Sequence, residues 1–279
     1  TKDEVFSTRG RANLLRELVY SDPSEMRIRE LKETFDLCLA CKGCKAECPS
    51  KVDMAKLKIA FLERYYQQHS HTLRETIFAY MPAMIETFKM IPSVYNFGLD
   101  LFTRLPILLD SVGITKERSL PRIRGKNKLE LKNKVAMKQV REVILLPDTY
   151  TRYFEPQIEQ AAIQILAYFG CKVHVLKTVG AGRTLISKGF IDAARKHLQR
   201  LTSDLAHLDP DGNIPIIALE PSEFSVLRDE LSSLLPGSNA KNISQRSWPF
   251  EEFLLRAIKD VKELNTVERN VILHTHCHQ

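Results

Sequence analysis

The stretch Cys38-Leu-Ala-Cys41-Lys-Gly-Cys44-Lys-Ala-Glu-Cys48-Pro49 decides the fold of the N-terminal part of this chain. Thiolates at successive three-residue intervals can curl around one cubane cluster, which predicts a 4Fe-4S site. Structural zinc, the main alternative, is generally held by two short pairs of ligands separated by a longer loop. The tight spacing therefore favours iron over zinc, with Cys38, Cys41, Cys44 and Cys48 as the ligands.

Cys48 leaves two arrangements open. In two-cluster ferredoxins the fourth cysteine of such a run binds the other cluster, and no second cysteine set lies between Thr1 and Gln279. Either Cys48 completes a single cluster, or it binds a second cluster whose other ligands precede Thr1; we favour the second arrangement. Because the chain begins without Met and stops behind an apolar run, we expect both termini to be truncated.

Three lysines, Lys42, Lys45 and Lys51, surround the cysteine loop. Positive charge near the cluster sulfurs raises the reduction potential, although lysines that only solvate a loop between helices would give the same pattern. Helical periodicity over 8–20 and 25–37 precedes the loop. Ser50-x-x-Asp53 has the form of a capping box, and Ala55, Ile59, Leu62 and Tyr66 give the following helix an apolar stripe.

Residues 72–109 are apolar but are interrupted by Pro82, Pro92 and Pro106 and by scattered charges. No uncharged run approaches the roughly 20 residues of a membrane helix, so short packed helices are expected. Between Lys116 and Lys138 nine basic and two acidic residues account for the whole net charge of +7. We interpret this stretch as a solvated linker, with acidic phospholipid or an acidic redox partner as the alternative contact and nucleic acid as a distant one.

The apolar pattern changes after this linker. Val143 to Leu146 and Lys172 to Leu176 are typical of buried strands, and a helical repeat from Pro156 to Gly170 lies between them. Such a βαβ unit predicts a right-handed crossover between parallel strands. Further segments continue the alternation, with strands expected at 214–219 and 271–274 and helices at 190–201, 222–235 and 249–259.

The expected fold is therefore α+β overall, with an all-helical ferredoxin-like cluster domain followed by an α/β domain with a parallel sheet. The predicted divisions are 1–70 for the cluster domain, 71–140 for a helical segment with the basic linker, and 141–279 for the α/β domain, truncated at its C-terminus. A hydrophobic content of 44% and a charged content of 27% are ordinary for a globular protein.

Several segments together resemble one enzyme family. They are Thr1-Lys-Asp-Glu4, Ser7-Thr-Arg-Gly-Arg-Ala-Asn13, Asp36 to Ser50, Val52-Asp-Met-Ala-Lys-Leu-Lys58, Asp148 to Pro156, Gly182-Arg-Thr-Leu-Ile-Ser187, Leu219-Glu-Pro-Ser222 and His276-Cys-His-Gln279. The chain resembles the iron-sulfur half of fused FAD-linked 2-hydroxyacid dehydrogenases of the D-lactate, glycolate and D-2-hydroxyglutarate type. Its second part is similar to the cysteine-rich CCG domain of such oxidoreductases and of heterodisulfide reductases.

This resemblance implies an FAD domain and a further cysteine group before Thr1, in the same polypeptide. It also implies an oxidoreductase acting on CH-OH groups, in which electrons pass from FAD through the cluster to a quinone or another acceptor. No residue of this chain is assigned a catalytic role, so we expect the chain alone to be inert. Crowded cysteines and the lack of a signal peptide predict a cytoplasmic location, with peripheral contact at the inner face of the cell membrane left open.

The chain departs from the family pattern in its second part. Gly180-Ala181-Gly182 stands where Cys-Cys-Gly is usual, and Glu223 stands where cysteine commonly follows Pro-Ser. We therefore expect a docking or structural platform there. A nucleotide-binding turn at 179–183 is disfavoured because it lacks a third glycine and a matched acidic residue. These departures also support the rival hypothesis of a metal-stabilised protein-interaction module, with zinc or a structural cluster and without a redox role.

Two further cysteines lie outside the loop. Cys277 is flanked by His276 and His278, but in a strand histidines at alternate positions share one face and Cys277 points to the other. Metal binding by His276 and Cys277 therefore needs a bend, and a polar strand end is the alternative. Cys171 follows Gly170 at a helix end and is expected to be a buried small residue.

Overall fold

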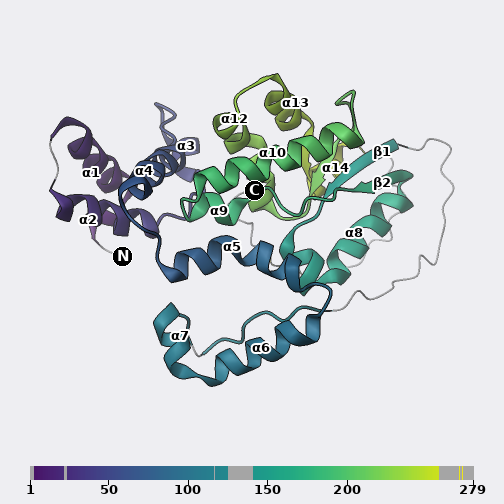
Figure 1. Ribbon diagram of the computed structural model, residues 1–279. Coiled ribbons are helices and arrows are strands. Elements are labelled where there is room, and N and C mark those ends of the chain that lie inside the picture. The colour runs from purple at the N-terminus through teal and green to yellow at the C-terminus, as the bar shows by residue number, and fades with distance from the viewer. Residues whose placement is uncertain are drawn as a thin grey trace. The chain divides into compact units, whose positions relative to one another are not determined.

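Residues 3–21, 24–115, 117–124 and 141–257, with 270 and 272, are described by the computed structural model, in which they form two units (Figure 1). The first unit contains residues 3–71 and Gly189–Ile191, and the second contains Thr72–Lys188 and the residues from Asp192 onward. The second unit carries a four-stranded sheet. A mixture of helical and α/β structure is thus confirmed, whereas the ferredoxin-like arrangement and the divisions at residues 70 and 140 stay predictions.

The first unit is built from short helices around a small core. The helices are η1 (Glu4–Phe6), α1 (Thr8–Tyr20), α2 (Glu25–Asp36), α3 (Gly43–Glu47) and α4 (Met54–Gln68). Leu14, Leu31, Phe35 and Met54 form the buried cluster, and Cys38 and Cys44 pack against it. The cysteine loop is therefore attached to the core of this unit.

Two local features differ from the sequence-based expectation. The N-cap of α4 is Asp53, whose side chain accepts a hydrogen bond from the Lys56 N–H at 3.1 Å. The prediction of a capping box that starts at Ser50 is therefore wrong. The aspartate reaches the free N–H groups of the first turn directly. The cysteine loop also contains a helix, α3, that is too short to show a periodic apolar pattern.

The second unit begins with three helices, α5 (Leu73–Phe88), α6 (Pro92–Arg104) and α7 (Pro106–Val112). Thr72 and Glu75 form a complete capping box at the start of α5. Pro92 and Pro106 occupy first helical positions, where a missing N–H costs nothing. Pro82 lies inside α5 without ending it, so the expected interruption there is wrong.

The sheet consists of β1 (Arg141–Leu146), β2 (Cys171–Val175), β3 (Ile216–Ala218) and β4 (Ser247–Pro249), in the order β2-β1-β3-β4. All three neighbouring pairs are parallel, and Val143 pairs with Val173 while Leu145 pairs with Ile217. The predicted parallel βαβ unit is therefore confirmed. Val143, Leu145 and Ile217 are fully buried in the core of the sheet, together with Cys171 as expected.

Helices complete this unit: η2 (Tyr150–Phe154), α8 (Pro156–Tyr168), α9 (Arg183–Ser187), α10 (Ile191–Leu208), α11 (Pro221–Ser225), η3 (Val226–Glu230), α12 (Leu231–Leu234), α13 (Ser238–Arg246) and α14 (Phe250–Ala257). The single helix expected over 222–235 is interrupted by the π-helical turn η3, which an apolar repeat does not reveal. β4 and α13 were not anticipated.

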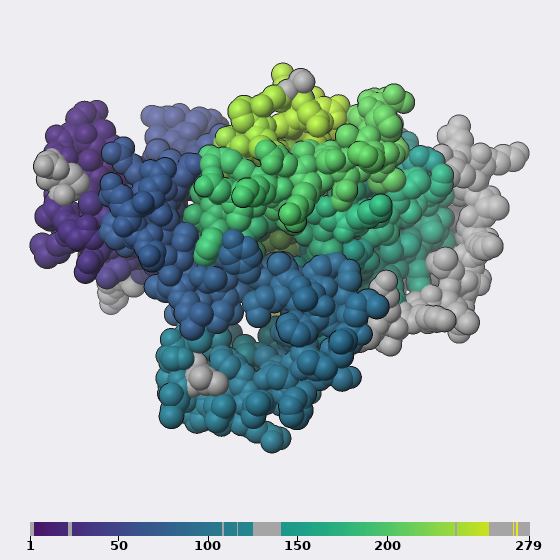
Figure 2. All heavy atoms as spheres, in the orientation of Figure 1, coloured from purple at the N-terminus to yellow at the C-terminus, as the bar shows by residue number. Residues whose placement is uncertain are grey.

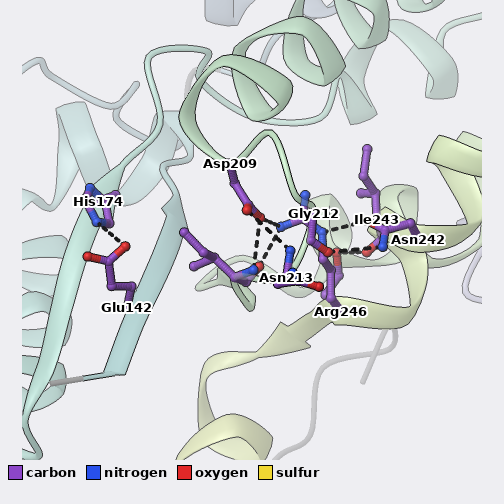
Figure 3. A network of polar contacts seen from close by, with 10 residues as sticks. Glu142, His174, Asp209, Gly212, Asn213, Asn242, Ile243 and Arg246 are labelled. Atoms are coloured by element: carbon purple, nitrogen blue, oxygen red, sulfur yellow. Dashed lines mark hydrogen bonds and ion pairs between the residues drawn. The ribbon is translucent and has the colours of Figure 1, made fainter. Parts of the chain in front are cut away.

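A polar network ties the end of α10 to the start of β3 and to α13 (Figure 3). The buried Asp209 accepts a hydrogen bond from the Ile214 N–H at 2.9 Å and pairs with Arg246, which in turn bonds Asn242 at 2.9 Å. Burial lowers the pKa of Arg246, although Asp209 opposes this effect. The network therefore fixes the turn that leads into β3.

Some predictions fall on residues outside the described part of the chain. These are the strand at 271–274, the histidines beside Cys277, and most of the basic stretch. No helix among the described residues is long and apolar enough to cross a membrane.

Candidate functional site

The cysteine loop has an unusual backbone. Cys38 follows the end of α2, Cys44 lies in α3, and Cys48 caps that helix with its N–H on the Cys44 carbonyl at 3.0 Å. Ala40, Lys42 and Lys51 adopt left-handed conformations with φ between 55° and 60°. Such conformations cost non-glycine residues roughly 1–2 kcal/mol each. The loop is therefore held in a tight curl by its surroundings rather than by its own preferences.

Three of the four cysteines share one cavity. Cys38, Cys41 and Cys44 line a space of about 230 Å³, together with Thr8, Arg11 and the start of α4. Cys48 is not on its wall. All four thiols are free of disulfide bonds. The loop thus separates its first three cysteines from the fourth.

Cys48 has its own electrostatic environment. The backbone N–H groups of Val52 and Ser50, with a smaller contribution from Lys51, hold the pKa of the Cys48 thiol below its usual range. Amide donors of this kind stabilise a thiolate, which is the form that binds metal. The left-handed turn at Lys51 gives these N–H groups their position.

Lys58 is a residue that the sequence analysis missed. Its side chain is 6% exposed and donates from Nζ to the Cys38 carbonyl at 2.8 Å. Lys58 lies three residues after Ala55 and four before Leu62, so a lysine on the apolar stripe was the available signal. Of the predicted lysines, Lys45 forms an ion pair with Asp53 at 3.3 Å.

The four thiols of the loop have the chemistry of cluster ligands. Four free thiols, three on one cavity and one among amide donors, suit the soft thiolate ligation of iron-sulfur clusters. Among the described residues, however, no group of three or more His, Cys, Asp or Glu side chains stands close enough to hold one metal ion. The chemistry of the residues fits a cluster, and cluster ligation stays a prediction.

In the second unit, the two departures from the CCG pattern lie against each other. Glu223 is buried, and its Oε2 accepts hydrogen bonds from the N–H groups of Ala181 at 2.6 Å and Arg183 at 3.4 Å. A Cβ on Gly180 would approach the Glu223 Oε1 to 3.0 Å, and Gly180 has a φ of +67°. The loop accommodates this carboxylate because it has glycine there, and no thiol is available at these positions for a metal centre.

Burial dominates the electrostatics around Glu223. It raises the pKa of Glu223 to about 7, although the amide donors and Arg183 act in the opposite direction. Arg183 is itself buried and pairs with Glu230 at 3.2 Å while donating to the Ser222 carbonyl at 3.1 Å. A charged and hydrogen-bonded cluster thus occupies the region where the resemblance would lead one to expect cysteines.

The remaining candidates lie elsewhere. His276 and Cys277 fall outside the described residues, so their predicted metal binding is untested. Cys171 lies in the sheet core, where burial raises the pKa of its thiol. It is thus a structural residue, as expected.

The comparisons with known proteins lead to one class of enzyme, the dehydrogenases. The chain is similar to D-2-hydroxyglutarate dehydrogenases from three bacteria: 27% identical over 75% of the chain in Pseudomonas putida, 24% over 79% in Escherichia coli and 24% over 74% in Haemophilus influenzae. It spans only 21% to 25% of the length of these relatives. No family model matches the chain, and no solved structure matches it significantly. The chain is thus similar to one part of these larger dehydrogenases.

Proposed function

We propose that this chain is the iron-sulfur electron-transfer portion of a flavin-dependent 2-hydroxyacid dehydrogenase. The observation that carries the proposal is the cysteine loop, in which three free thiols share one cavity and the fourth lies among amide donors. The similarity to D-2-hydroxyglutarate dehydrogenases favours D-2-hydroxyglutarate as the substrate over D-lactate or glycolate. FAD on another part of the polypeptide and a quinone or other acceptor complete the proposed route.

Each residue of the loop has a defined task in this proposal. Cys38, Cys41 and Cys44 hold one 4Fe-4S cluster, and Cys48 either completes it or extends to a second. Once bound, the cluster supplies one-electron transfer between flavin and acceptor. The N–H groups of Ser50 and Val52 favour the thiolate of Cys48, and Lys58 donates a hydrogen bond to the carbonyl of Cys38.

Anaerobic reconstitution with iron and sulfide tests the proposal. We expect the full chain to bind iron and sulfide, to absorb in the visible range, to bleach with dithionite and to give an EPR signal when reduced. Cys41→Ala should lose most of this iron, because it removes a thiolate from the shared cavity.

Cys171→Ala is the matched control, since this cysteine lies in the sheet core and should keep full iron content. Stoichiometric zinc with no iron would instead support the metal-stabilised interaction module. Equal iron content in both variants would contradict the assignment of the loop.

We further propose that α6 contacts an anionic lipid surface. Val94, Phe97 and Leu101 follow one face of this helix at spacings of three and four residues, Leu105 caps its C-terminus, and Phe97 is 72% exposed. The sequence places an excess of seven positive charges immediately after α7. An apolar helix face that is followed closely in the sequence by clustered basic residues suits binding at the interface of acidic membranes, where a quinone acceptor would be available.

A further inference from the structure

A cavity of about 400 Å³ lies at the carboxyl edge of the sheet. Its base is formed by the segments that follow the strands: Thr149 after β1, residues 177–179 and Gly182 after β2, and Glu223 after β3. The helices α5 and α10 form its walls, and Figure 2 shows a hollow where the blue surface of α5 meets the green surface of α10. All of these residues belong to the second unit.

The topology of the sheet makes this location a natural binding site. In the order β2-β1-β3-β4, the chain leaves β1 toward one side and leaves β3 toward the other. Loops that diverge in this way open a crevice at the carboxyl ends of parallel strands, where α/β proteins bind their ligands. The volume is also within the range of small-molecule pockets.

The charged residues that line the cavity indicate the charge of the ligand it would bind. Lys177, Lys196 and Arg200 line it, and none of them forms an ion pair or hydrogen bond with another described residue. Lys196 and Arg200 lie one turn apart on α10 and therefore share a face. By contrast, the neighbouring Arg195 is paired with Asp192 at 3.0 Å. Three unpaired cations around one concave site favour an anionic ligand.

Glu223 adds a second requirement at the base of the cavity. Its side chain is buried, and Oε2 is engaged by the loop amides, whereas Oε1 has no hydrogen-bond donor among the described residues. Because Glu223 lines the cavity, its Oε1 can accept a hydrogen bond from a bound ligand. A hydroxyl group on the ligand would satisfy it.

We propose that this cavity binds a small hydroxycarboxylate, with its carboxylate groups on Lys177, Lys196 and Arg200 and its hydroxyl donating to Glu223. This site is separate in sequence and chemistry from the cysteine loop. The inference stands on the side chains of the second unit, and only the choice of D-2-hydroxyglutarate as the probe rests on the proposed function.

Isothermal titration of the full chain with D-2-hydroxyglutarate tests this site. We expect saturable one-to-one binding that weakens about tenfold in Arg200→Ala and in Lys196→Ala. Both side chains are exposed, so these variants should fold normally. Lys172→Ala is the control, because it removes an exposed lysine of the same unit that lies outside the cavity. It should bind as the wild type does.

Glutarate and 2-oxoglutarate examine the role of the hydroxyl, because both keep two carboxylates and neither carries a hydroxyl. We expect each to bind several-fold more weakly than the hydroxy acid, and Glu223→Leu to abolish this preference. Equal affinities for all three, or for inorganic phosphate, would overturn the hydroxycarboxylate assignment. No saturable binding, or equal losses in Lys172→Ala and Arg200→Ala, would overturn the site itself, whatever the iron content of the chain.

Discussion

Glu223 is the residue in which local structure and chemistry are most closely connected. Its carboxyl group fits against Gly180 only because glycine leaves room and tolerates a positive φ. The N–H groups of Ala181 and Arg183 donate hydrogen bonds to Oε2, while burial raises the pKa of the Glu223 carboxyl group. The sequence showed that cysteines were absent at both positions. It could not show that the two departures form one contact, because 42 residues separate the partners in the chain.

The raised pKa of Glu223 predicts a pH-dependent stability. The pKa rises from 4.5 to about 7 on folding, so between these values the folded chain keeps a proton that the unfolded chain releases. The free energy of unfolding should therefore fall as pH rises through this window and level off above about pH 7. At about 1.4 kcal/mol per pKa unit, the loss is roughly 3 kcal/mol.

Urea denaturation of metal-free chain at several pH values measures this effect. Glu223→Gln does not titrate, so its stability relative to the wild type should improve by about 3 kcal/mol between pH 4.5 and 7.5. Glu251→Gln, at an exposed position on α14, serves as the control and should follow the wild type. Parallel curves for Glu223→Gln and the wild type would show that this carboxyl group does not titrate in the window.

At the scale of helices and strands, elements with a strong periodic pattern were predicted correctly, whereas short elements and local exceptions were not. The predicted helix over 8–20 coincides with α1, and the alternation of strand, helix and strand gave β1, α8 and β2. β4 is only three residues long, which is too short for a periodic signal. Pro82 is tolerated within α5 because the capping box and packing of that helix compensate for one lost hydrogen bond.

The exposed face of α6 predicts lipid binding. Co-sedimentation with vesicles should show binding when they contain anionic lipid and much weaker binding to neutral vesicles. Phe97→Ser with Leu101→Ser removes two apolar anchors, each worth about 1.5–3 kcal/mol when buried, so affinity should fall at least about tenfold.

Leu255→Ser is the matched control for this experiment, since Leu255 is 77% exposed on α14, away from α6 in sequence. Its affinity for vesicles should not change. If the double variant on α6 binds as well as the wild type, the apolar face has another occupant, such as a further part of the polypeptide.

At the scale of the whole molecule, the two units differ in what stabilises their folds. The sheet unit has a continuous core in which Val143, Leu145 and Ile217 are fully buried. The helical unit has a smaller buried cluster and a cysteine loop with three strained residues. The sequence revealed the cysteines but not this strain, because left-handed conformations at Ala40, Lys42 and Lys51 carry no composition signal.

Iron-sulfur loading should therefore stabilise the two units unequally. Binding to a site that is not formed in the unfolded chain adds its free energy to folding, and here that energy enters through the cysteine loop. In hydrogen exchange, amides of the loop, α2 and α4 should exchange at least about tenfold more slowly after loading, whereas β1 and β3 should change little. Cys41→Ala treated in the same way should show no gain. Equal protection of both units in the wild type would mean that the effect of the cluster is not confined to the helical unit, which would contradict this prediction.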